Sequence, residues 1–268
     1  MSFSGPGTPA SAADAYSAGA VAWAAGPGRI YARLAELLIA ASPVPLAGRL
    51  LCDVGAGTGV ASRAARAAGA RVVATDLAPG MLVVQRSDRP PAVVADATSL
   101  PFRDHVLGGV VAAYCYNHLD DPTVGLREGR RVTAPGGPVL ASAYADDDTH
   151  PVKDASEQAL REIGWAAPGF HADFKQNASS KLATVPRAEA AARAAGLHAI
   201  AVAAMRAPFP ELTVAELVEW RLGMAHTAWF VNQLPPGARD ALVARTVELL
   251  GADVPILVRS VIHIAALA

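Results

Sequence analysis

An acidic residue and three closely spaced glycines give the chain its clearest chemical signal. Asp53 is followed by Gly55, Gly57 and Gly59 in the segment DVGAGTG. Glycines permit a sharp turn and let the backbone approach a ligand closely, and the helix expected behind them offers unpaired N–H groups. The Asp53 carboxylate would repel a pyrophosphate, but it suits a cationic group such as a sulfonium or an ammonium. The segment therefore predicts a nucleotide-type site that also accepts positive charge.

The spacing of these glycines distinguishes the loop from the dinucleotide-binding fingerprint. That fingerprint reads GxGxxG, whereas this loop reads GxGxG. A dehydrogenase or another nucleotide-binding protein is therefore disfavoured, but it stays open as a candidate function. A purely structural alternative stays open, in which Gly57 and Gly59 serve only a tight turn.

Two further acidic residues stand where strands are expected to end. Asp76 lies 17 residues after Gly59, and a carboxylate at the tip of a second strand can accept both hydroxyls of a ribose. Asp96 lies in the segment VVADATSLPF, after the third expected strand. Structural alternatives stay open here as well, because Asp76 could cap the helix that begins at Pro79 and Asp96 could be a turn residue.

Candidates for catalysis follow the fourth expected strand, in the segment YCYNHLDDP of residues 114–122. In a doubly wound sheet, the carboxyl ends of the strands line the ligand crevice. His118 could deprotonate a hydroxyl or an amine near neutral pH, or it could simply fix the loop. Tyr116 is a second candidate for catalysis, and Asn117 is a candidate for substrate binding.

The elements that must position these residues alternate along the chain. Strands are expected at 49–54, 71–75, 91–95, 106–114, 137–144, 198–205 and 254–267. Helices are expected at 12–25, 29–41, 58–68, 79–85, 123–132, 152–163, 186–195, 214–229 and 236–250, with a break at 26–28 between the first two. This alternation predicts an α/β fold with a mainly parallel, doubly wound sheet and helices on both of its faces.

The segment DVGAGTG resembles the first motif of the class I S-adenosylmethionine (SAM)-dependent methyltransferases of the small-molecule type. The segments VVATD, VVADATSLPF and RVTAPGG match later motifs in the family's order. The resemblance covers about residues 49–145 and, more weakly, 186–205 and 254–268. It implies a Rossmann-like sheet of seven strands, mostly parallel, whose antiparallel last strand inserts beside strand five.

The resemblance also implies a cofactor, SAM, and its product S-adenosylhomocysteine (SAH). Asp76 would bind the ribose, while Asp96 and Ala97 would bind the adenine. The expected cofactor-binding residues are Asp53, Gly55, Ala56, Gly57, Gly59, Asp76, Leu77, Met81, Asp96, Ala97, Tyr114, Tyr16 and Trp23.

One domain with two insertions is expected, preceded by an N-terminal segment. Residues 1–45 would form an N-terminal tail and a helical lid, which resembles the lid of small-molecule methyltransferases and carries Tyr16, Trp23 and Tyr31. Residues 46–268 would form the SAM-binding domain, with cap insertions at about 146–185 and 207–253 around the acceptor pocket. The expected substrate-binding residues are Asn117, Trp165, His171, His226 and Trp229, with Phe170, Phe174, Trp220 and Phe230 as further aromatic candidates. Packing within the lid and cap is the structural alternative for all of them.

We therefore expect methyl transfer from SAM to an O, N or C nucleophile of a small, largely apolar metabolite. The sulfonium is already activated, so positioning alone can contribute much, roughly 7–11 kcal/mol in the best intramolecular models. A general base is needed only when the nucleophile arrives protonated. The alternative is a SAM-binding protein of the same fold that catalyses a non-methylating reaction such as cyclisation.

The composition of the chain limits the classes of partner that we expect. The 268 residues carry a formal net charge of −1, and no run of Lys and Arg is longer than Arg130-Arg131, which disfavours a nucleic-acid partner. The first 14 residues look like a tail without the features of a signal peptide, and no apolar run is long enough to span a membrane. We expect a cytoplasmic monomer or homodimer with no metal, in which Cys52 and Cys115 are buried free thiols.

Overall fold

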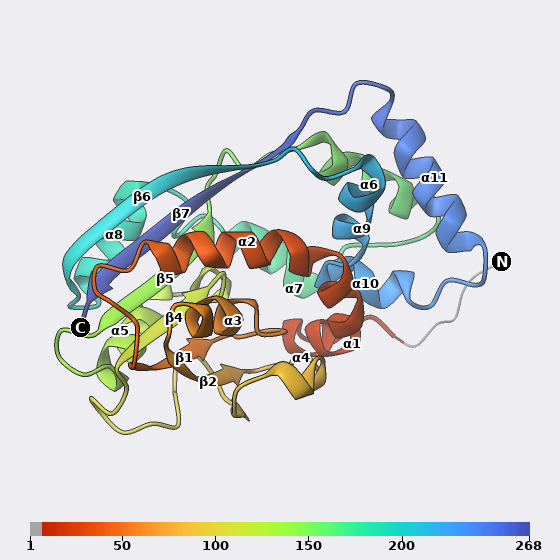
Figure 1. The fold of residues 1–268 in the computed structure, drawn as a ribbon. Helices are drawn as coiled ribbons and strands as arrows, with labels where there is room; N and C mark the ends of the chain where they lie inside the picture. Colours follow the sequence, from red (N-terminus) through yellow and green to blue (C-terminus); the bar gives the residue numbers. More distant parts are fainter. Residues whose placement is uncertain (1–6) are drawn as a thin grey trace.

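A seven-stranded sheet forms the centre of the fold, in the order β3-β2-β1-β4-β5-β7-β6 (Figure 1). The strands are β1 Leu50–Val54, β2 Arg71–Asp76, β3 Ala92–Val94, β4 Gly109–Ala113, β5 Pro138–Tyr144, β6 His198–Phe209 and β7 Leu257–Leu267. Strands β1 to β5 pair in parallel, whereas β7 is antiparallel to both β5 and β6. The predicted doubly wound sheet, with its antiparallel last strand beside strand five, is confirmed.

The computed structural model describes residues 7–268, so the start of the expected N-terminal tail, residues 1–6, lies outside the described residues. Its helices are α1 Ala12–Ala25, α2 Pro27–Ala40, α3 Val60–Ala67, α4 Pro79–Val83, α5 Pro122–Val132, α6 Pro151–Glu162, α7 Gly169–Asp173, α8 Val185–Ala194, α9 Val214–Leu222, α10 Ala225–Val231 and α11 Ala238–Leu250. Two short helical turns matter for the site, η2 at Tyr116–His118 and η3 at Phe174–Ala178.

Two apolar cores lie on the two faces of the sheet. Helices α2 and α3 cover one face, where Leu34 and Leu38 pack in the same core as Val111. Helices α5 and α8 cover the other, where Leu126 packs in the same core as Val110. Successive strand residues point to opposite faces, which is why Val110 and Val111 of β4 belong to different cores. The sheet is therefore held rigidly from both sides, as a platform for loops at its edge.

Two expected helix boundaries are wrong. Only Gly26 separates α1 from α2, since Pro27 occupies the first turn of α2, a position that proline tolerates well. The helix expected at 214–229 is divided into α9 and α10 at Gly223. A Cβ atom at Gly223 would lie 2.6 Å from Cδ of Pro27 and 2.7 Å from the carbonyl oxygen of Ala22, so the break lets α9 approach the α1–α2 junction. The short pair α7 and η3 was not expected.

Helices α6, α9, α10 and α11 gather beyond one end of the sheet, on the right of Figure 1. Helix α1 connects the two parts of the fold, because it packs against α10 on one side and against α4 on the other. The approach to α4 is close, since a Cβ atom at Gly80 would lie 2.5 Å from Cα of Ser17. Helix α1 and the gathered helices therefore enclose the space outside the carboxyl ends of β1 and β2.

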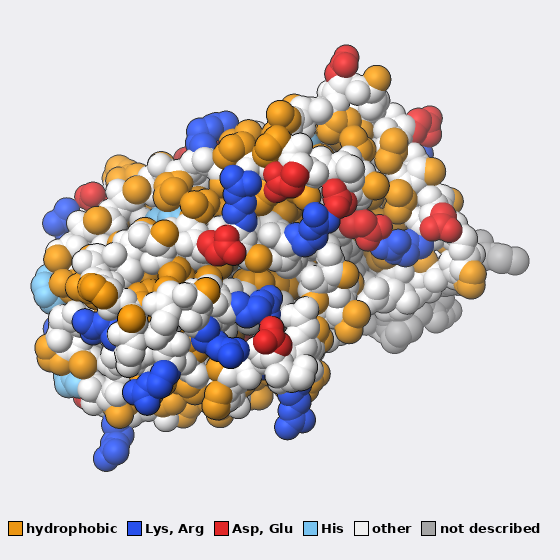
Figure 2. All heavy atoms as spheres, in the orientation of Figure 1, with side chains coloured by type: hydrophobic (Ala, Val, Ile, Leu, Met, Phe, Trp, Pro, Cys, Tyr) orange, Lys and Arg blue, Asp and Glu red, His pale blue; other side chains and the backbone are white. Residues whose placement is uncertain are grey.

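No helix among residues 7–268 is both long enough and apolar enough to cross a membrane. On the face shown in Figure 2, basic and acidic side chains are interspersed.

Candidate functional site

A cavity of about 910 Å³ opens at the carboxyl ends of β1, β2 and β4, beneath α1 and the gathered helices. Small-molecule sites typically measure about 300–1,000 Å³, so this cavity lies near the upper end of that range. Its two ends differ in chemistry. Glycines and the acidic residues Asp53, Asp76 and Asp96 line the sheet end, whereas aromatic and charged side chains line the end near α6 and α9. We call these the sheet end and the cap end.

The glycine loop takes a conformation that other residues adopt rarely. Gly55, Gly57 and Gly59 have φ values of +65°, +55° and +84°. A Cβ atom at Gly55 would lie 2.5 Å from Sγ of Cys115, and one at Gly57 would lie 3.2 Å from Cε of Met81. The tight turn of this loop therefore does require glycine. The absence of side chains at Gly55 and Gly57 also leaves space for a ligand, because both residues line the cavity.

Asp53 holds a buried carboxylate oxygen with no partner. Its Oδ2 accepts a hydrogen bond of 2.6 Å from Oγ of Ser62, while Oδ1 is buried without a hydrogen bond. Burial raises the pKa of this carboxyl to about 6, and the bond from Ser62 opposes the rise. A buried acceptor without a partner is costly. Because Asp53 lines the cavity, a cationic donor there would satisfy it.

Asp76 both organises the loop and faces the cavity. Its two oxygens accept backbone N–H groups, Oδ2 from Gly57 at 2.7 Å and Oδ1 from Ala78 at 2.8 Å. Burial raises the pKa of this carboxyl as well. The bond from Ala78 forms a turn before α4, and α4 itself has no side-chain cap, so the capping alternative is not supported. Each oxygen still has a second lone pair for ligand hydroxyls.

Asp96 similarly combines a turn with a place on the cavity wall. Its Oδ1 accepts hydrogen bonds of 2.7 Å from both the backbone N–H and the hydroxyl of Thr98. Ala97, Leu77 and Met81 line the same end of the cavity, and the Leu77 side chain is exposed there. The structure thus brings together most of the residues predicted for the cofactor, although Gly59 is the N-cap of α3 and does not line the cavity.

His118 lies where α1 meets the residues after β4. Its Nε2 is 3.4 Å from the hydroxyl of Tyr16, and its ring stacks on Phe174 with the centroids 4.6 Å apart. The side chain faces the open cavity, and the protein that surrounds it elsewhere lowers its pKa to about 4. These contacts join the residues after β4 to α1 and to η3, which agrees with the loop-fixing alternative for His118.

The prediction that Tyr116 takes part in catalysis is wrong. Its side chain is fully buried in the core beneath α5, where a Cβ atom at Gly125 would lie 2.6 Å from the ring. Tyr116 does not line the cavity and cannot touch reacting atoms there. Two glycines of α5, Gly125 and Gly129, make the space that the ring fills. The expected catalytic role fails because the chain turns at η2 and sends this side chain behind the sheet.

The predicted acceptor residues divide into two groups. Asn117, His171 and His226 line the cavity, whereas Trp165 and Trp229 do not. The indole N–H groups of both tryptophans donate to the carbonyl oxygen of His226, at 3.1 and 3.0 Å. These tryptophans therefore correspond to the packing alternative and support the backbone from which His226 projects.

Tyr114 lies between the two ends of the cavity. Its φ of +56° is unusual for a residue with a side chain, and such strain costs about 1–3 kcal/mol and is concentrated at functional sites. Its ring stacks on that of Tyr144 at a centroid distance of 4.5 Å and meets Tyr31 edge-on at 5.2 Å. Trp23 packs on Tyr31 at 5.0 Å and also lines the cavity. The three tyrosines, with the tryptophan behind them, form an aromatic wall.

Several charged residues of the site were not predicted. Arg89 donates from Nη2 to the carbonyl oxygens of Gly57 and Met81, both at 2.8 Å, and so braces the glycine loop. At the cap end the unpredicted residues include the charged Asp148, Lys153, Glu157, Arg221 and Arg259 and the uncharged Tyr144. One sequence signal existed, because Arg259 is the one Arg, Lys, Asp or Glu in the mostly apolar segment ILVRSVIHIAAL, whose other polar residues are Ser260 and His263.

A cluster at the cap end has the composition of a metal site. One ligand atom each from Glu157, His171 and His226 lie within 4.8 Å of one another, and the two imidazoles stack at 3.9 Å. Nη2 of Arg221, however, lies 3.4 Å from Nε2 of His226 and 3.7 Å from Oε1 of Glu157. The guanidinium already supplies a cation at this position and would repel a metal ion. We therefore assign no metal to the cluster.

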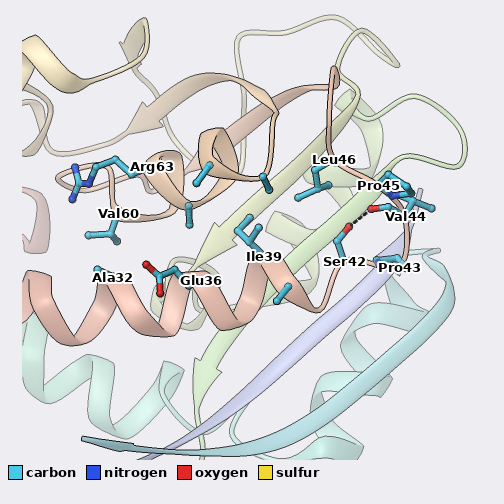
Figure 3. A pocket seen from close by; sticks show the side chains of 14 residues that line it. Ala32, Glu36, Ile39, Ser42, Pro43, Val44, Pro45, Leu46, Val60 and Arg63 are labelled. Carbon is cyan, nitrogen blue, oxygen red and sulfur yellow. Dashed lines mark hydrogen bonds between the residues drawn. The ribbon is translucent and has the colours of Figure 1, made fainter. Parts of the chain in front are cut away.

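A second hollow, of about 840 Å³, lies between α2 and α3 and is shown in Figure 3. Its wall is mostly aliphatic, with Glu36 and Arg63 as its charged residues. The bond drawn in Figure 3 joins Oγ of Ser42 to the carbonyl oxygen of Val44 at 2.8 Å. None of the lining side chains leaves a buried polar atom without a partner, so this hollow shows no sign of a reactive site.

Comparison with known sequences supports the motif assignment. Residues 52–141 match a family model described as a methyltransferase domain. A demethylmenaquinone methyltransferase of Clavibacter sepedonicus is 35% identical over 141 residues, which cover 51% of this chain and 56% of that protein. Another, of Mycolicibacterium gilvum, is 40% identical over 93 residues, which cover 35% of this chain and 41% of that protein. The chain thus spans about half the length of the curated relatives it matches.

Comparison with solved structures concerns the fold. Phosphoethanolamine N-methyltransferase 2 of Haemonchus contortus, in complex with SAM, aligns with a TM-score of 0.56 at 21% identity, over 88% of this chain and 52% of that one. The 4+2 cyclase SpnF aligns with a TM-score of 0.51 at 19% identity, over 88% of this chain and 80% of that one. One fold thus hosts proteins named for different reactions, and the side chains of the cavity must decide between them.

Proposed function

We propose that the chain is a class I SAM-dependent methyltransferase, as the match of residues 52–141 to a methyltransferase domain supports, and that it transfers a methyl group from SAM to a small-molecule acceptor. The observation that carries the proposal is the unpartnered, buried Oδ1 of Asp53 beside the glycine loop. A dinucleotide would place phosphate near this carboxylate, whereas SAM would place its α-ammonium group there. Calorimetric titration with SAM, SAH and NAD tests this directly, and tight binding of NAD without binding of SAM would refute it.

The residues at the sheet end fit SAM. Asp53 would accept from the α-ammonium group, Asp76 from the ribose hydroxyls, and Asp96 with the backbone of Ala97 would contact the adenine. When bound, SAM supplies a methyl group on a positively charged sulfur. Gly55 and Gly57 leave space for the ligand to approach the backbone, and Arg89 keeps the loop in place.

Positioning is the main catalytic contribution that we propose for this chain. The aromatic wall of Tyr31, Tyr114 and Tyr144 would orient a flat acceptor, and α1 would exclude water from the cavity. His118 would fix α1 through Tyr16 rather than remove a proton. A base is unnecessary when the acceptor arrives already deprotonated.

The acceptor that we propose is a small metabolite with a flat, largely apolar skeleton. Aromatic side chains at the cap end support this choice, as do the matched relatives, which are named for methylation of a demethylmenaquinone. The acceptor atom, O, N or C, is not part of the proposal. The cytoplasmic location and the monomeric or homodimeric state remain predictions from the sequence.

The affinity for SAM should depend on pH through Asp53. Burial places the pKa of this carboxyl at about 6 without ligand, and the ammonium group binds only the ionised form. About one carboxyl in ten is ionised one pH unit below the pKa, so SAM should bind about tenfold more weakly at pH 5 than at pH 7.5. The raised pKa also stabilises the ligand-free fold most at acid pH, and this contribution is lost as the pH rises through about 6.

The matched variant is Asp53→Asn, which keeps the shape of the side chain and removes its titration. We expect weaker SAM binding with no step between about pH 5 and 7.5 in calorimetry. If wild type and variant show the same pH dependence, Asp53 does not contact the ammonium group.

A further inference from the structure

Two arginines are buried at the cap end, Arg221 of α9 and Arg259 of β7, and their exposed fractions are only 6% and 2%. Both lie beside the ring of Trp220, with guanidinium carbons 5.4 and 4.6 Å from its centroid. The guanidinium of Arg259 also lies 4.0 Å from the centroid of Tyr144. Burying a charge is expensive unless it is paired and fully hydrogen-bonded. The hydrogen-bond and charge partners of the two arginines therefore decide whether their charges are fully compensated when the cavity holds no ligand.

The buried acidic partners neutralise these cations only in part. Asp148 accepts from Nε and Nη2 of Arg259 at 2.9 and 2.7 Å, and it also accepts from Lys153 at 2.7 Å. Glu157 lies 3.7 Å from Arg221 and pairs more closely with Arg161, at 2.9 Å. Arg221, Arg259 and Lys153 thus share two carboxylates. The remaining acidic residues on this part of the wall, Asp146, Asp154 and Asp173, are exposed.

Three hydrogen-bond donors at the cap end are buried without partners: Nε of Arg221, Nη1 of Arg259 and Nε1 of Trp220. All three groups can only donate. The hydroxyls of Tyr114 and Tyr144 are also unpartnered, and they can donate as well. Leaving such donors unsatisfied costs free energy that a ligand with several acceptor oxygens would recover. A carboxylate has two anionic oxygens and matches guanidinium geometry well.

We propose that the cap end is a carboxylate subsite, so that the acceptor is a flat aromatic or conjugated carboxylic acid. Its carboxylate would lie among Arg221, Arg259 and Trp220, and its ring would lie against Tyr114 and Tyr144. This inference rests on the proposed methyl transfer, because it assigns the cap end to the acceptor. It refines the expected largely apolar metabolite by adding one anionic group at a defined end.

The test compares three probes of similar shape, 2-naphthoate, 2-naphthamide and 2-naphthol, by calorimetric titration into the protein saturated with SAH. We expect 2-naphthoate to bind about tenfold or more tightly than the neutral amide, since a charge-assisted hydrogen bond contributes at least that much. Equal binding of acid and amide, tighter binding of the naphthol, or no binding of the acid would overturn the subsite.

Arg221→Gln should weaken binding of 2-naphthoate about tenfold or more and change that of 2-naphthamide less than about twofold. This variant leaves Glu157 paired with Arg161. Arg221→Lys keeps the charge and should retain part of the preference for 2-naphthoate over 2-naphthamide. This second variant keeps the test valid if Arg221→Gln misfolds. Arg193→Gln is the control, because Arg193 pairs with Glu189 on α8 and does not line the cavity. An undiminished preference in Arg221→Gln would overturn the proposal.

The titration with SAH separates this inference from the proposed function. Arg221→Gln should bind SAH as wild type does, because the sheet end is unchanged. Failure of the wild type to bind SAH would refute the proposed function itself, whereas normal SAH binding without carboxylate preference refutes only the subsite.

Discussion

Gly57→Val is expected to abolish detectable SAM binding while the sheet stays folded. The backbone at Gly57 has a φ of +55°, where a β-branched residue is strained by about 1–2 kcal/mol. A Cβ atom there would lie 3.2 Å from Cε of Met81, and the two methyl groups of valine would extend beyond it into space that the ligand needs. We expect an affinity loss of at least about a hundredfold in calorimetry, equivalent to roughly 2.7 kcal/mol.

The control for backbone strain is Gly136→Val. Gly136 has a φ of +74°, but a Cβ atom there would have no neighbouring atom within 4 Å. Both variants should lower the free energy of unfolding by a similar amount in urea, yet only Gly57→Val should lose SAM. Normal SAM binding by Gly57→Val would remove the glycine loop from the site.

Deletion of residues 1–25 is expected to stop turnover and to weaken SAM binding. Helix α1 contributes Tyr16 to the cavity wall and connects to α2 through Gly26 alone. Because α1 lines the cavity, we expect it to act as a lid that moves when ligands exchange, and such lids are usually among the less stable parts of a fold. Hydrogen exchange of residues 12–25 should therefore slow when SAH binds. Equal exchange with and without SAH, together with turnover by the truncated protein, would reduce α1 to a packing role.

A point substitution tests the same lid without removing buried residues such as Trp23. A Cβ atom at Gly80 would lie 2.5 Å from Cα and 2.6 Å from the carbonyl oxygen of Ser17, so Gly80→Ala should displace α1 from α4. We expect faster exchange in α1 and weaker SAM binding. Gly169→Ala is the matched control, because a Cβ atom at Gly169 meets nothing within 4 Å.

The sheet could be predicted from the sequence because each strand is marked by a pattern within its own few residues. Apolar strands and the stops after them locate the seven strands within a few residues, and glycine or proline marks most helix ends. The two wrong boundaries depend on distant contacts. Gly26 and Gly223 allow close approach to Glu219 and Pro27, respectively, and no local pattern reveals that α9 packs there.

The two ends of the cavity differ in predictability for the same reason. The sheet end is built from one continuous motif and the tips of neighbouring strands, so the sequence could predict that Asp53, Asp76 and Asp96 lie together, as they do on the wall of one cavity. The cap end joins Tyr144, Arg221 and Arg259, which come from β5, α9 and β7. Closeness in sequence within a loop does not predict which way a side chain points. Tyr116 lies two residues from His118, yet it packs in the core behind the sheet.

The most direct test of the central claim is formation of SAH, measured by mass spectrometry, when the protein is incubated with SAM and acceptors that bind to it in calorimetry. Methyl transfer predicts one SAH for each acceptor converted, with a product one methyl group heavier than the acceptor. Gly57→Val should form none. Conversion of an acceptor without SAH formation, or bound SAM and acceptor that never yield SAH, would contradict the account and favour a non-methylating reaction on the same fold.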